Sequence, residues 1–419
     1  MREMKDSGIE WIGDIPKNWN MSKIGSLYTQ RNEKVSDKEY QPLSVTMQGV
    51  LPQLASAAKT DDGDNRKLVR VGDFAINSRS DRRGSCGISP LDGSVSLINI
   101  ILTPRTTMHP GYYDWLFHTT LFADEFYKWG HGIVADLWTT RWQEMKSICV
   151  PVPEYAEQKH ISEFLDSECA EIDAVLEKTR ASIDEYKKLK QTVITQAVTK
   201  GIRGGRPMKD SGESFLHKVP VGWTNSKIKY CAIFSPLCNT SHLTEDSIVT
   251  FTPMECIKNG YFENREAVFA SMNSSYTQYQ EGDIVFAKVT PCFENGNIAI
   301  MQGLSFEFGF GSSELFVLRP KSINTKFLFY YLQNDIFKQY ACATMTGTGG
   351  LKRVSPSFVR NFPIFLPSDS EQADIAEYLD YKCKEIDLLI SKKQQYLTEI
   401  ENYKKSLIYE YVTGKKEVI

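Results

Sequence analysis

Two stretches of the chain have the hydrophobic spacing of long amphipathic helices. Between Glu157 and Val198 there is no proline or glycine, and apolar residues recur every three or four positions. They are Ile161, Phe164, Leu165, Ile172, Val175, Leu176, Ile183, Tyr186, Leu189, Val193 and Ile194. A second stretch, from Glu371 to about Leu407, repeats this spacing. Lysine and glutamate fill many of the remaining positions, so the pattern predicts two helices with one apolar stripe each.

Residues at the ends of these stretches predict where the helices begin and end. Ser368 and Glu371 have the spacing of a capping box and directly follow Pro367, which favours a helix start at this point. Gly201 and Gly414 stand just beyond the last periodic residues. Glycine adopts the left-handed backbone that commonly closes a helix, so we expect both to be C-terminal caps.

The two helical stretches are copies of each other. "EQKHISEFLDSECAEID" from Glu157 aligns with "EQADIAEYLDYKCKEID" from Glu371 at an offset of 371 − 157 = 214. A second repeated segment, nearer the start of each copy, has an offset of 204. There "MKDSG" begins at both Met4 and Met208, and Trp19 corresponds to Trp223. Each copy is long enough to hold a domain and a helix, so the chain is a tandem duplication.

The duplication divides the chain into four parts, at 1–153, 154–200, 201–367 and 368–415. In the first and third parts, β-like runs such as "KLVRVGDFAIN" and "GDIVFAKV" contain Gly-Asp turns. The aromatic stretches "YYDWLFHTTLFADEFYKW" and "FLFYYLQNDIFKQYA" are more typical of helices. We therefore expect an α+β fold, in which a mixed α and β region is followed by a long helix, twice.

The length of the first helix restricts how the copies can be arranged. A helix of about 40 residues is about 60 Å long, at about 1.5 Å per residue. The link from Lys200 to Pro207 reaches at most about 28 Å, so it cannot return to the start of that helix. To bury its stripe against the first helix, the second must run antiparallel to it. The expected molecule is a dumbbell with approximate two-fold symmetry, joined by an antiparallel coiled coil.

Composition excludes several classes of protein. Nine cysteines lack the CxxC and Cys/His spacings of zinc sites, which indicates reduced thiols. The charged start "MREMKDSG" is not typical of a signal peptide, and no apolar run is long enough to span a bilayer. We therefore expect a cytoplasmic protein without a membrane partner. The net charge of −3 does not indicate nucleic-acid binding, although residues 201–367 carry 16 basic and 13 acidic groups.

No motif with known catalytic mechanics occurs in the sequence. HExxH and GxSxG are absent, and "GTGGLKRVS" lacks the G-x4-G-K-[ST] spacing of a phosphate-binding loop. The six histidines are dispersed, and His160 has Asp374 at its duplicated position. We therefore predict a chain that is not an enzyme by itself and that binds no metal or cofactor.

Basic and amide side chains gather instead in four loops. Such side chains can neutralise phosphates or read base edges in a DNA groove. The candidates are Arg79, Arg82 and Arg83 in "NSRSDRRG", Thr140 and Arg141 in "HGIVADLWTTRW", Lys288, Thr290, Asn295 and Asn297 in "FAKVTPCFENGN", and Thr348, Lys352 and Arg353 in "TGTGGLKRVS". The alternative is that these loops are only solvated. We expect the tryptophans, Trp138 among them, in the core rather than stacked on bases.

In combination, these features resemble a known family, the specificity subunits of type I restriction–modification systems. The openings "MKDSGIEWIGDIPKNW" and "MKDSGESFLHKVPVGW" are similar to the family's start of each recognition domain. "GDIVFAKVTPCFENGNIAI" is similar to a recurring strand and loop of those domains. "VPVPEYAEQKHISEFLD" and "FLPSDSEQADIAEYLD" resemble the regions that lead into its long helices. The likeness covers nearly the whole chain, and it is fuller in the second copy than in the first.

The resemblance implies a non-catalytic subunit that binds double-stranded DNA. Residues 1–153 and 201–367 would each be a target-recognition domain for one half of a bipartite, asymmetric sequence, and the helix pair would set the spacer. Two adenine-N6 methyltransferase subunits using S-adenosylmethionine would be its partners. Restriction subunits using ATP and magnesium could join them. A non-catalytic coiled-coil adaptor with protein-binding globular regions is the alternative.

Overall fold

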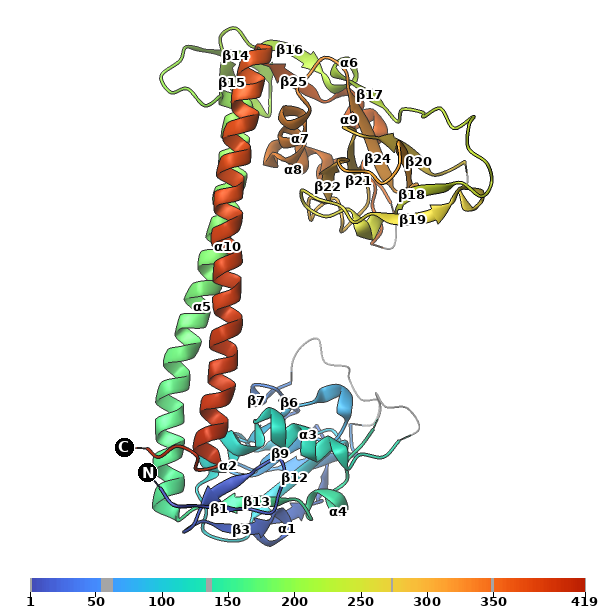
Figure 1. Cartoon of the computed structure of the whole chain (residues 1–419). Helices are drawn as coiled ribbons and strands as arrows, with labels where there is room; N and C mark the ends of the chain where they lie inside the picture. Colours follow the sequence, from blue (N-terminus) through green and yellow to red (C-terminus); the bar gives the residue numbers. More distant parts are fainter. Residues whose placement is uncertain (1, 54–62, 133–137, 273, 348–349, 419) are drawn as a thin grey trace. The chain divides into compact units, whose positions relative to one another are not determined.

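The chain folds into two compact units. The computed structural model describes residues 2–418 except 54–62, 133–137, 273 and 348–349. Unit 1 comprises Met1–Arg180 and Gln395–Ile419, and unit 2 comprises Ala181–Gln394. The helices α5 (Tyr155–Lys200) and α10 (Asp369–Val412) are 46 and 44 residues long and contribute to both units (Figure 1). The prediction of two long helices is confirmed.

The predicted helix ends are confirmed as well. Gly201 and Gly414 follow α5 and α10 closely with φ angles of 76° and 72°, in the left-handed region that favours glycine. At the start of α10, the Glu371 N–H donates to Ser368 Oγ at 3.3 Å. Both glycines also lie close to the buried tryptophans, Gly201 to Trp223 and Gly414 to Trp19.

Within each unit the two helices run antiparallel. In unit 1, Asp173 of α5 pairs with Lys404 of α10 at 2.6 Å. In unit 2, Lys190 of α5 pairs with Asp387 of α10 at 2.7 Å. The duplication offset of 214 carries Asp173 onto Asp387 and Lys190 onto Lys404, so the same ion pair is formed twice.

The described residues of unit 1 form five small sheets. Their strand orders are β1-β2, β10-β9-β12-β4, β11-β8-β5, β13-β3 and β6-β7. The strands are β1 (Met4–Asp6), β2 (Asp14–Pro16), β3 (Asn20–Lys23), β4 (Tyr28–Arg31), β5 (Lys34–Val35), β6 (Leu43–Thr46), β7 (Gly49–Pro52), β8 (Arg66–Val69), β9 (Phe74–Asn77), β10 (Cys86–Ile88), β11 (Gly93–Val95), β12 (Asn99–Pro104) and β13 (Cys149–Val152). The helices, besides the long ones, are α1 (Ile24–Leu27), α2 (Pro110–Phe117), α3 (Thr120–Lys128) and α4 (Trp142–Met145).

Unit 2 repeats this plan, with four sheets in the part of it that the structure describes. Their orders are β14-β15, β16-β25, β17-β24-β21-β22 and β19-β18-β23-β20. The strands are β14 (Met208–Glu213), β15 (Leu216–Pro220), β16 (Thr224–Lys227), β17 (Ala232–Phe234), β18 (Ile248–Thr252), β19 (Arg265–Val268), β20 (Thr277–Gln280), β21 (Ile284–Ala287), β22 (Ile298–Ile300), β23 (Phe308–Gly311), β24 (Leu315–Pro320) and β25 (Pro363–Leu366). The shorter helices are α6 (Ile228–Cys231), α7 (Thr325–Gln333), α8 (Asp335–Ala343) and α9 (Pro356–Asn361).

Each aromatic stretch forms two short helices rather than one. The break between α2 and α3 falls at Thr119, whose hydroxyl accepts from Phe122 N. The break between α7 and α8 falls at Asn334, whose side chain accepts from Phe337 N. Both residues are helix N-caps, so a local hydrogen bond restarts the helix at the equivalent place in each unit.

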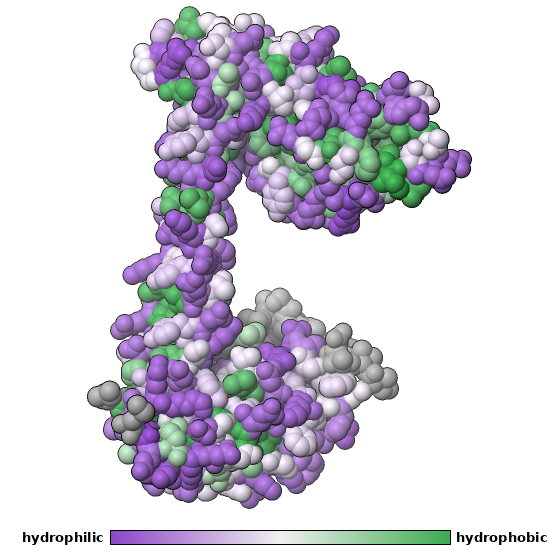
Figure 2. Space-filling view, viewed as in Figure 1, coloured by the Kyte–Doolittle hydropathy of each residue, from purple (hydrophilic) through white to green (hydrophobic). Residues whose placement is uncertain are grey.

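The core of each unit joins its globular region to both long helices. In unit 1 the buried Trp19 packs in one cluster with Ile161 of α5 and Val412 of α10. In unit 2 the buried Trp223 packs with Val198 of α5 and Ile375 of α10. Each globular region therefore rests on the start of one long helix and the end of the other. Hydrophilic residues cover most of the visible surface of both units (Figure 2).

Candidate nucleic-acid interface

In unit 2, two predicted DNA-contact loops are tied together by the backbone and by one threonine. Val289, just beyond β21, forms a β-bridge with Arg353, which also bridges Thr346. The Thr290 hydroxyl donates to Gly350 O at 2.8 Å and accepts from Lys352 N at 2.9 Å. The described parts of residues 288–297 and 344–354 therefore form one structure, which we call the unit 2 loop pair.

Glu314 fixes the charged side of the unit 2 loop pair. Arg353 donates to both carboxylate oxygens of Glu314, at 2.8 Å from Nη2 and 3.0 Å from Nε. Lys288 Nζ lies 3.9 Å from the same carboxylate and donates to Ser313 O. The hydrogen bonds from Arg353 lower the pKa of Glu314. The stabilisation from this pair is therefore complete above the ordinary pKa of glutamate and is lost as pH falls through the lowered one.

Three candidates of the unit 2 loop pair lie at its surface. Lys352 and Asn295 are exposed, and within the described residues neither side chain has a hydrogen bond or ion pair. Asn297 is half-buried. Thr290 is buried at 8% exposure, and its hydroxyl is used inside the loop pair. Thr348 lies outside the described residues.

Unit 1 ties its corresponding loops together in the same way. Arg79, just beyond β9, forms a β-bridge with Thr139, and Ser80 N donates to Trp138 O at 2.9 Å. Thr140 is fully buried, and its hydroxyl donates to Phe126 O at 2.9 Å. We call the described parts of residues 78–85 and 131–141 the unit 1 loop pair.

The arginines of the unit 1 loop pair differ in how far they are neutralised. Arg79 pairs with Asp81 at 3.1 Å, and Arg83 pairs with Asp124. Arg82 is 69% exposed, and its Nε lies 4.0 Å from Asp81 Oδ2, farther than the 3.1 Å of the Arg79 pair. Arg141 is exposed just before α4. Arg82 and Arg141 are therefore the most accessible cations of this loop pair.

One expectation about the aromatic residues is wrong. Trp138 is 38% exposed in the unit 1 loop pair, whereas Trp19 and Trp223 are buried as expected. Trp138 stands next to residues 133–137, which lie outside the described residues. An exposed indole beside basic side chains has a face on which a base could stack.

Sequence reasoning missed the acidic partners of both loop pairs. Asp81 stands among the arginines of "NSRSDRRG", so its role as a counter-charge had a local signal. Glu314 is 39 residues from Arg353 along the chain, so no local pattern in the sequence indicated this partner. Among the described residues, no group of histidine, cysteine, aspartate and glutamate side chains could hold a metal ion. A separate finding is that, in the part of the chain that the structure describes, no helix is long and apolar enough to cross a membrane.

Comparison with known proteins finds similarity to one family. Residues 221–399 match the family described as the type I restriction modification DNA specificity domain. The specificity subunit of the type I restriction enzyme EcoEI from Escherichia coli is 30% identical over 217 residues, 49% of this chain and 35% of that subunit. That of EcoAI, also from Escherichia coli, is 34% identical over 180 residues, 42% of this chain and 30% of the relative. These matches are to type I restriction–modification specificity subunits, and each spans less than half of this chain.

Further relatives and solved structures extend the similarity along the chain. The MjaVIII specificity subunit of Methanocaldococcus jannaschii is 25% identical over 289 residues, 65% of this chain and 63% of its own length. The matches to EcoEI and EcoAI span only about a third of those relatives. A chain from a structural study of type I complex assembly and conformational transition has a TM-score of 0.74 and 14% identity, covering 96% of this chain and 99% of its own.

A second solved structure has a looser similarity. The HsdS subunit of Thermoanaerobacter tengcongensis has a TM-score of 0.52 and 16% identity, covering 96% of this chain and 98% of its own. At such identities, both structural matches show a shared fold. The expected fold class, a duplicated mixed region followed each time by a long helix, is confirmed.

Proposed function

We propose that this chain is the sequence-specific DNA-binding subunit of a type I restriction–modification complex. The observation that carries the proposal is the repeated loop pair. In both units, the loop that follows a central strand is bridged to a second loop, and exposed basic side chains lie at the junction. A duplicated frame with different loop sequences is suited to reading two different halves of one target.

The side chains of the loop pairs fall into two proposed roles. Lys352, Arg82 and Arg141 are exposed cations suited to phosphate contact, and Asn295 and Asn297 have amides that can pair with adenine. The second role is to hold the loops in place. Thr290, Thr140, Arg353, Arg79, Arg83 and Lys288 already have partners inside the protein. Thr348 stays a predicted DNA contact.

The proposed partners follow from the same family. We propose that two adenine-N6 methyltransferase subunits bind the long helices and that restriction subunits can join the complex. Exposed apolar residues on α10, among them Tyr381, Leu388 and Tyr403, support a protein partner on this helix. S-adenosylmethionine, ATP and magnesium would belong to those partners. The chain itself would perform no chemical step, in the cytoplasm where the DNA lies.

A set of three substitutions separates DNA contact from loop positioning. With the modification subunits present, Lys352→Ala should weaken binding to all duplexes and reduce the slope of log K against log salt by about 1. Arg353→Ala and Glu314→Ala should both weaken binding to the cognate duplex and leave that slope nearly unchanged. The measurement is a salt series of affinities on cognate and scrambled DNA.

Glu314→Ala decides the role of Arg353. If Arg353 contacts DNA directly, removing its carboxylate partner frees the guanidinium, and affinity should stay the same or rise. Asp246→Ala serves as a control, because Asp246 is an exposed acid of unit 2 outside the loop pair. Unchanged affinity for Lys352→Ala, Arg353→Ala and Glu314→Ala would refute the assignment of the unit 2 loop pair as a DNA interface.

A further inference from the structure

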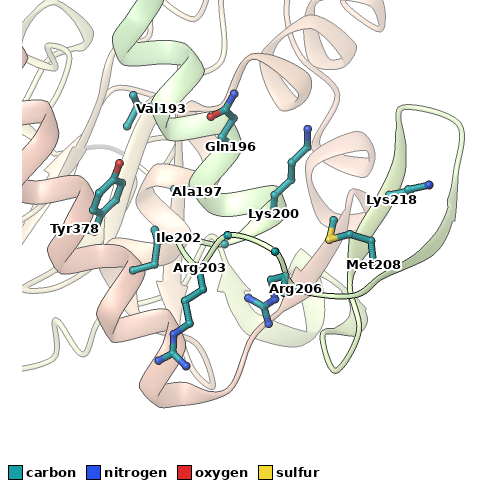
Figure 3. Close-up of a pocket in the computed structure, with 13 residues that line it drawn as sticks. Val193, Gln196, Ala197, Lys200, Ile202, Arg203, Arg206, Met208, Lys218 and Tyr378 are labelled. Atoms are coloured by element: carbon teal, nitrogen blue, oxygen red, sulfur yellow. The ribbon is translucent and has the colours of Figure 1, made fainter.

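Unit 2 has a cavity of about 620 Å³ at the end of α5, where the chain turns from this helix into β14. The link residues 201–206 form one wall, and α5, β14, β15 and Tyr378 of α10 form the others (Figure 3). Among the described residues, four cations line it, namely Lys200, Arg203, Arg206 and Lys218, and no acidic residue does. The cavity is separate from the unit 2 loop pair, none of whose residues line it.

The link leaves part of the cavity empty because it carries small residues. A Cβ atom added to Gly204 or Gly205 would meet no other atom within 4 Å. The φ of 71° at Gly205 favours glycine at that position. Gly204 has no positive φ, so its backbone conformation does not require glycine. Space is therefore open directly above the link.

The equivalent place in unit 1 is filled by the chain's own side chains. The ring of Tyr411, near the end of α10, packs on Phe164 of α5 with 4.5 Å between ring centroids. The offset of 214 carries Phe164 onto Tyr378 and Tyr411 onto Ala197. Both Tyr378 and Ala197 line the unit 2 cavity. The cavity thus exists where unit 2 has a methyl group in place of an aromatic ring.

In unit 1 the tail beyond α10 lies at this place, and its residues 415–418 correspond to the link residues 201–204 of unit 2 at the offset of 214. Lys416 pairs with Glu410 at 2.7 Å, and Val418 packs against the core of unit 1. Lys415 Nζ donates to Asp14 O at 3.0 Å. A basic and apolar tail therefore lies against positions that carry acidic residues, Glu410 and Asp14.

The charges of those positions change in unit 2. Glu410 corresponds to Gln196 at the offset of 214, and Asp14 corresponds to Lys218 at the offset of 204. Both Gln196 and Lys218 line the cavity. The equivalent surface in unit 2 is therefore neutral and basic, which favours an acidic segment over a basic one.

We propose that this cavity binds a short acidic segment of a partner protein, with an aliphatic side chain inserted above the link. The floor for that side chain is formed by Val193, Ala197 and Ile202. Lys200 and Lys218 receive the acidic groups, because within the described residues neither has an ion-pair partner.

A phosphate ligand fits the cavity less well. Arg206 and Arg203, the two arginines suited to bidentate phosphate binding, are already paired with Glu371 and Asp374. Only Lys200 and Lys218 remain, beside the apolar floor (Figure 3). The mixture of separated charges and aliphatic surface suits a peptide better than a compact anion.

The first test measures peptide binding to the full chain. The probe is a fluorescein-labelled five-residue peptide of glutamate and leucine, followed by anisotropy at low salt. Lys200→Glu with Lys218→Glu should weaken binding at least tenfold, and Ala197→Tyr should abolish it by supplying the ring that unit 1 has. The matched control is Lys178→Glu with Lys188→Glu, which makes the same charge change at exposed positions of α5 outside the cavity.

The outcomes of this test are distinct. Binding that the cavity variants lose and the control keeps supports the proposal. Equal binding by all variants overturns it. Displacement of the peptide by pyrophosphate, together with unchanged binding when serine replaces leucine, would mean that the cavity is an anion site instead.

The second test uses the assembled complex. A benzophenone-bearing residue at position 204, where added side-chain atoms meet open space, should cross-link to an acidic segment of a partner subunit. The same complex should not bind the labelled peptide, because the site is occupied. A cross-link to a basic segment, or none, contradicts the proposal. Neither test depends on DNA binding, so its failure would leave the proposed function untouched.

Discussion

The two units share one structural frame, the globular core packed on the two long helices. They differ in the side chains of their loop pairs. Trp19 Nε1 donates to Glu157 at 2.8 Å in unit 1, and Trp223 Nε1 donates to Glu371 at 3.3 Å in unit 2. An arginine pairs with each of these carboxylates, Arg2 in unit 1 and Arg206 in unit 2. The loop pairs, by contrast, keep their bridges but hardly any of their side chains.

The buried aspartate of each unit shows how a contact can persist while its residues change. Asp73 before β9 binds Arg31 of β4 at 2.7 Å. Asp283 before β21 binds Arg319 of β24 at 2.8 Å. The strand β12, equivalent to β24, has Thr103 at this place, and its hydroxyl also donates to Asp73. In both units an arginine pairs with the buried carboxylate, because a buried charge needs a partner. The arginine comes from a different strand in each unit.

The largest expected effect is the loss of that buried carboxylate. Asp283→Ala should destabilise unit 2 by about 3–5 kcal/mol, because it leaves the guanidinium of Arg319 without its partner. Adding Arg319→Thr, the residue type found in unit 1, should restore part of the loss. Denaturant unfolding monitored by unit-resolved hydrogen exchange measures both, and a double variant no better than the single one would contradict this explanation.

Removal of the shared carboxylate at the helix starts should have an intermediate effect. Glu157→Ala and Glu371→Ala each leave a tryptophan N–H and an arginine without a partner, at a cost of about 1–3 kcal/mol. Hydrogen exchange should show the loosening of unit 1 for Glu157→Ala and of unit 2 for Glu371→Ala. Equal loosening of both units by either variant would show that the units do not behave separately.

The duplicated ion pairs of the helices should matter least. Asp173→Ala and Asp387→Ala remove the partners of Lys404 and Lys190, and both carboxylates are more than half exposed. Each change should cost only about 0.2–1 kcal/mol, and less at high salt. Unfolding in two salt concentrations tests this, and a cost well above that of Glu371→Ala would mean that the exposed ion pairs stabilise the frame more than the shared carboxylates do.

The frame could be predicted from the sequence because its signals are local or repeated. Helix periodicity, the capping box at Ser368 and the caps at Gly201 and Gly414 lie within a few residues of the structures they define. The duplication in addition showed which residues of the two copies correspond. The antiparallel direction followed from the length of the first helix and the short link after it.

The loop pairs could be placed but not understood from the sequence. Lys352, Arg353 and Thr290 look equally polar in the sequence, yet the structure gives them different surroundings. Arg353 is paired with a carboxylate from the distant turn before β24, and Thr290 is buried between two loops. Such contacts join residues about 40 to 60 positions apart, for which neither spacing nor composition carries a signal.

Methylation of DNA tests the central claim most directly. Single-molecule methylation sequencing should compare cells that carry this chain and its modification subunit with cells that lack only this chain. We predict loss of a bipartite methyladenine motif, two short halves around a fixed gap, and a change in only one half when residues 344–354 are exchanged for those of a relative. An unchanged methylome, with expression and assembly of the subunits verified, would contradict the claim that this chain selects the DNA target.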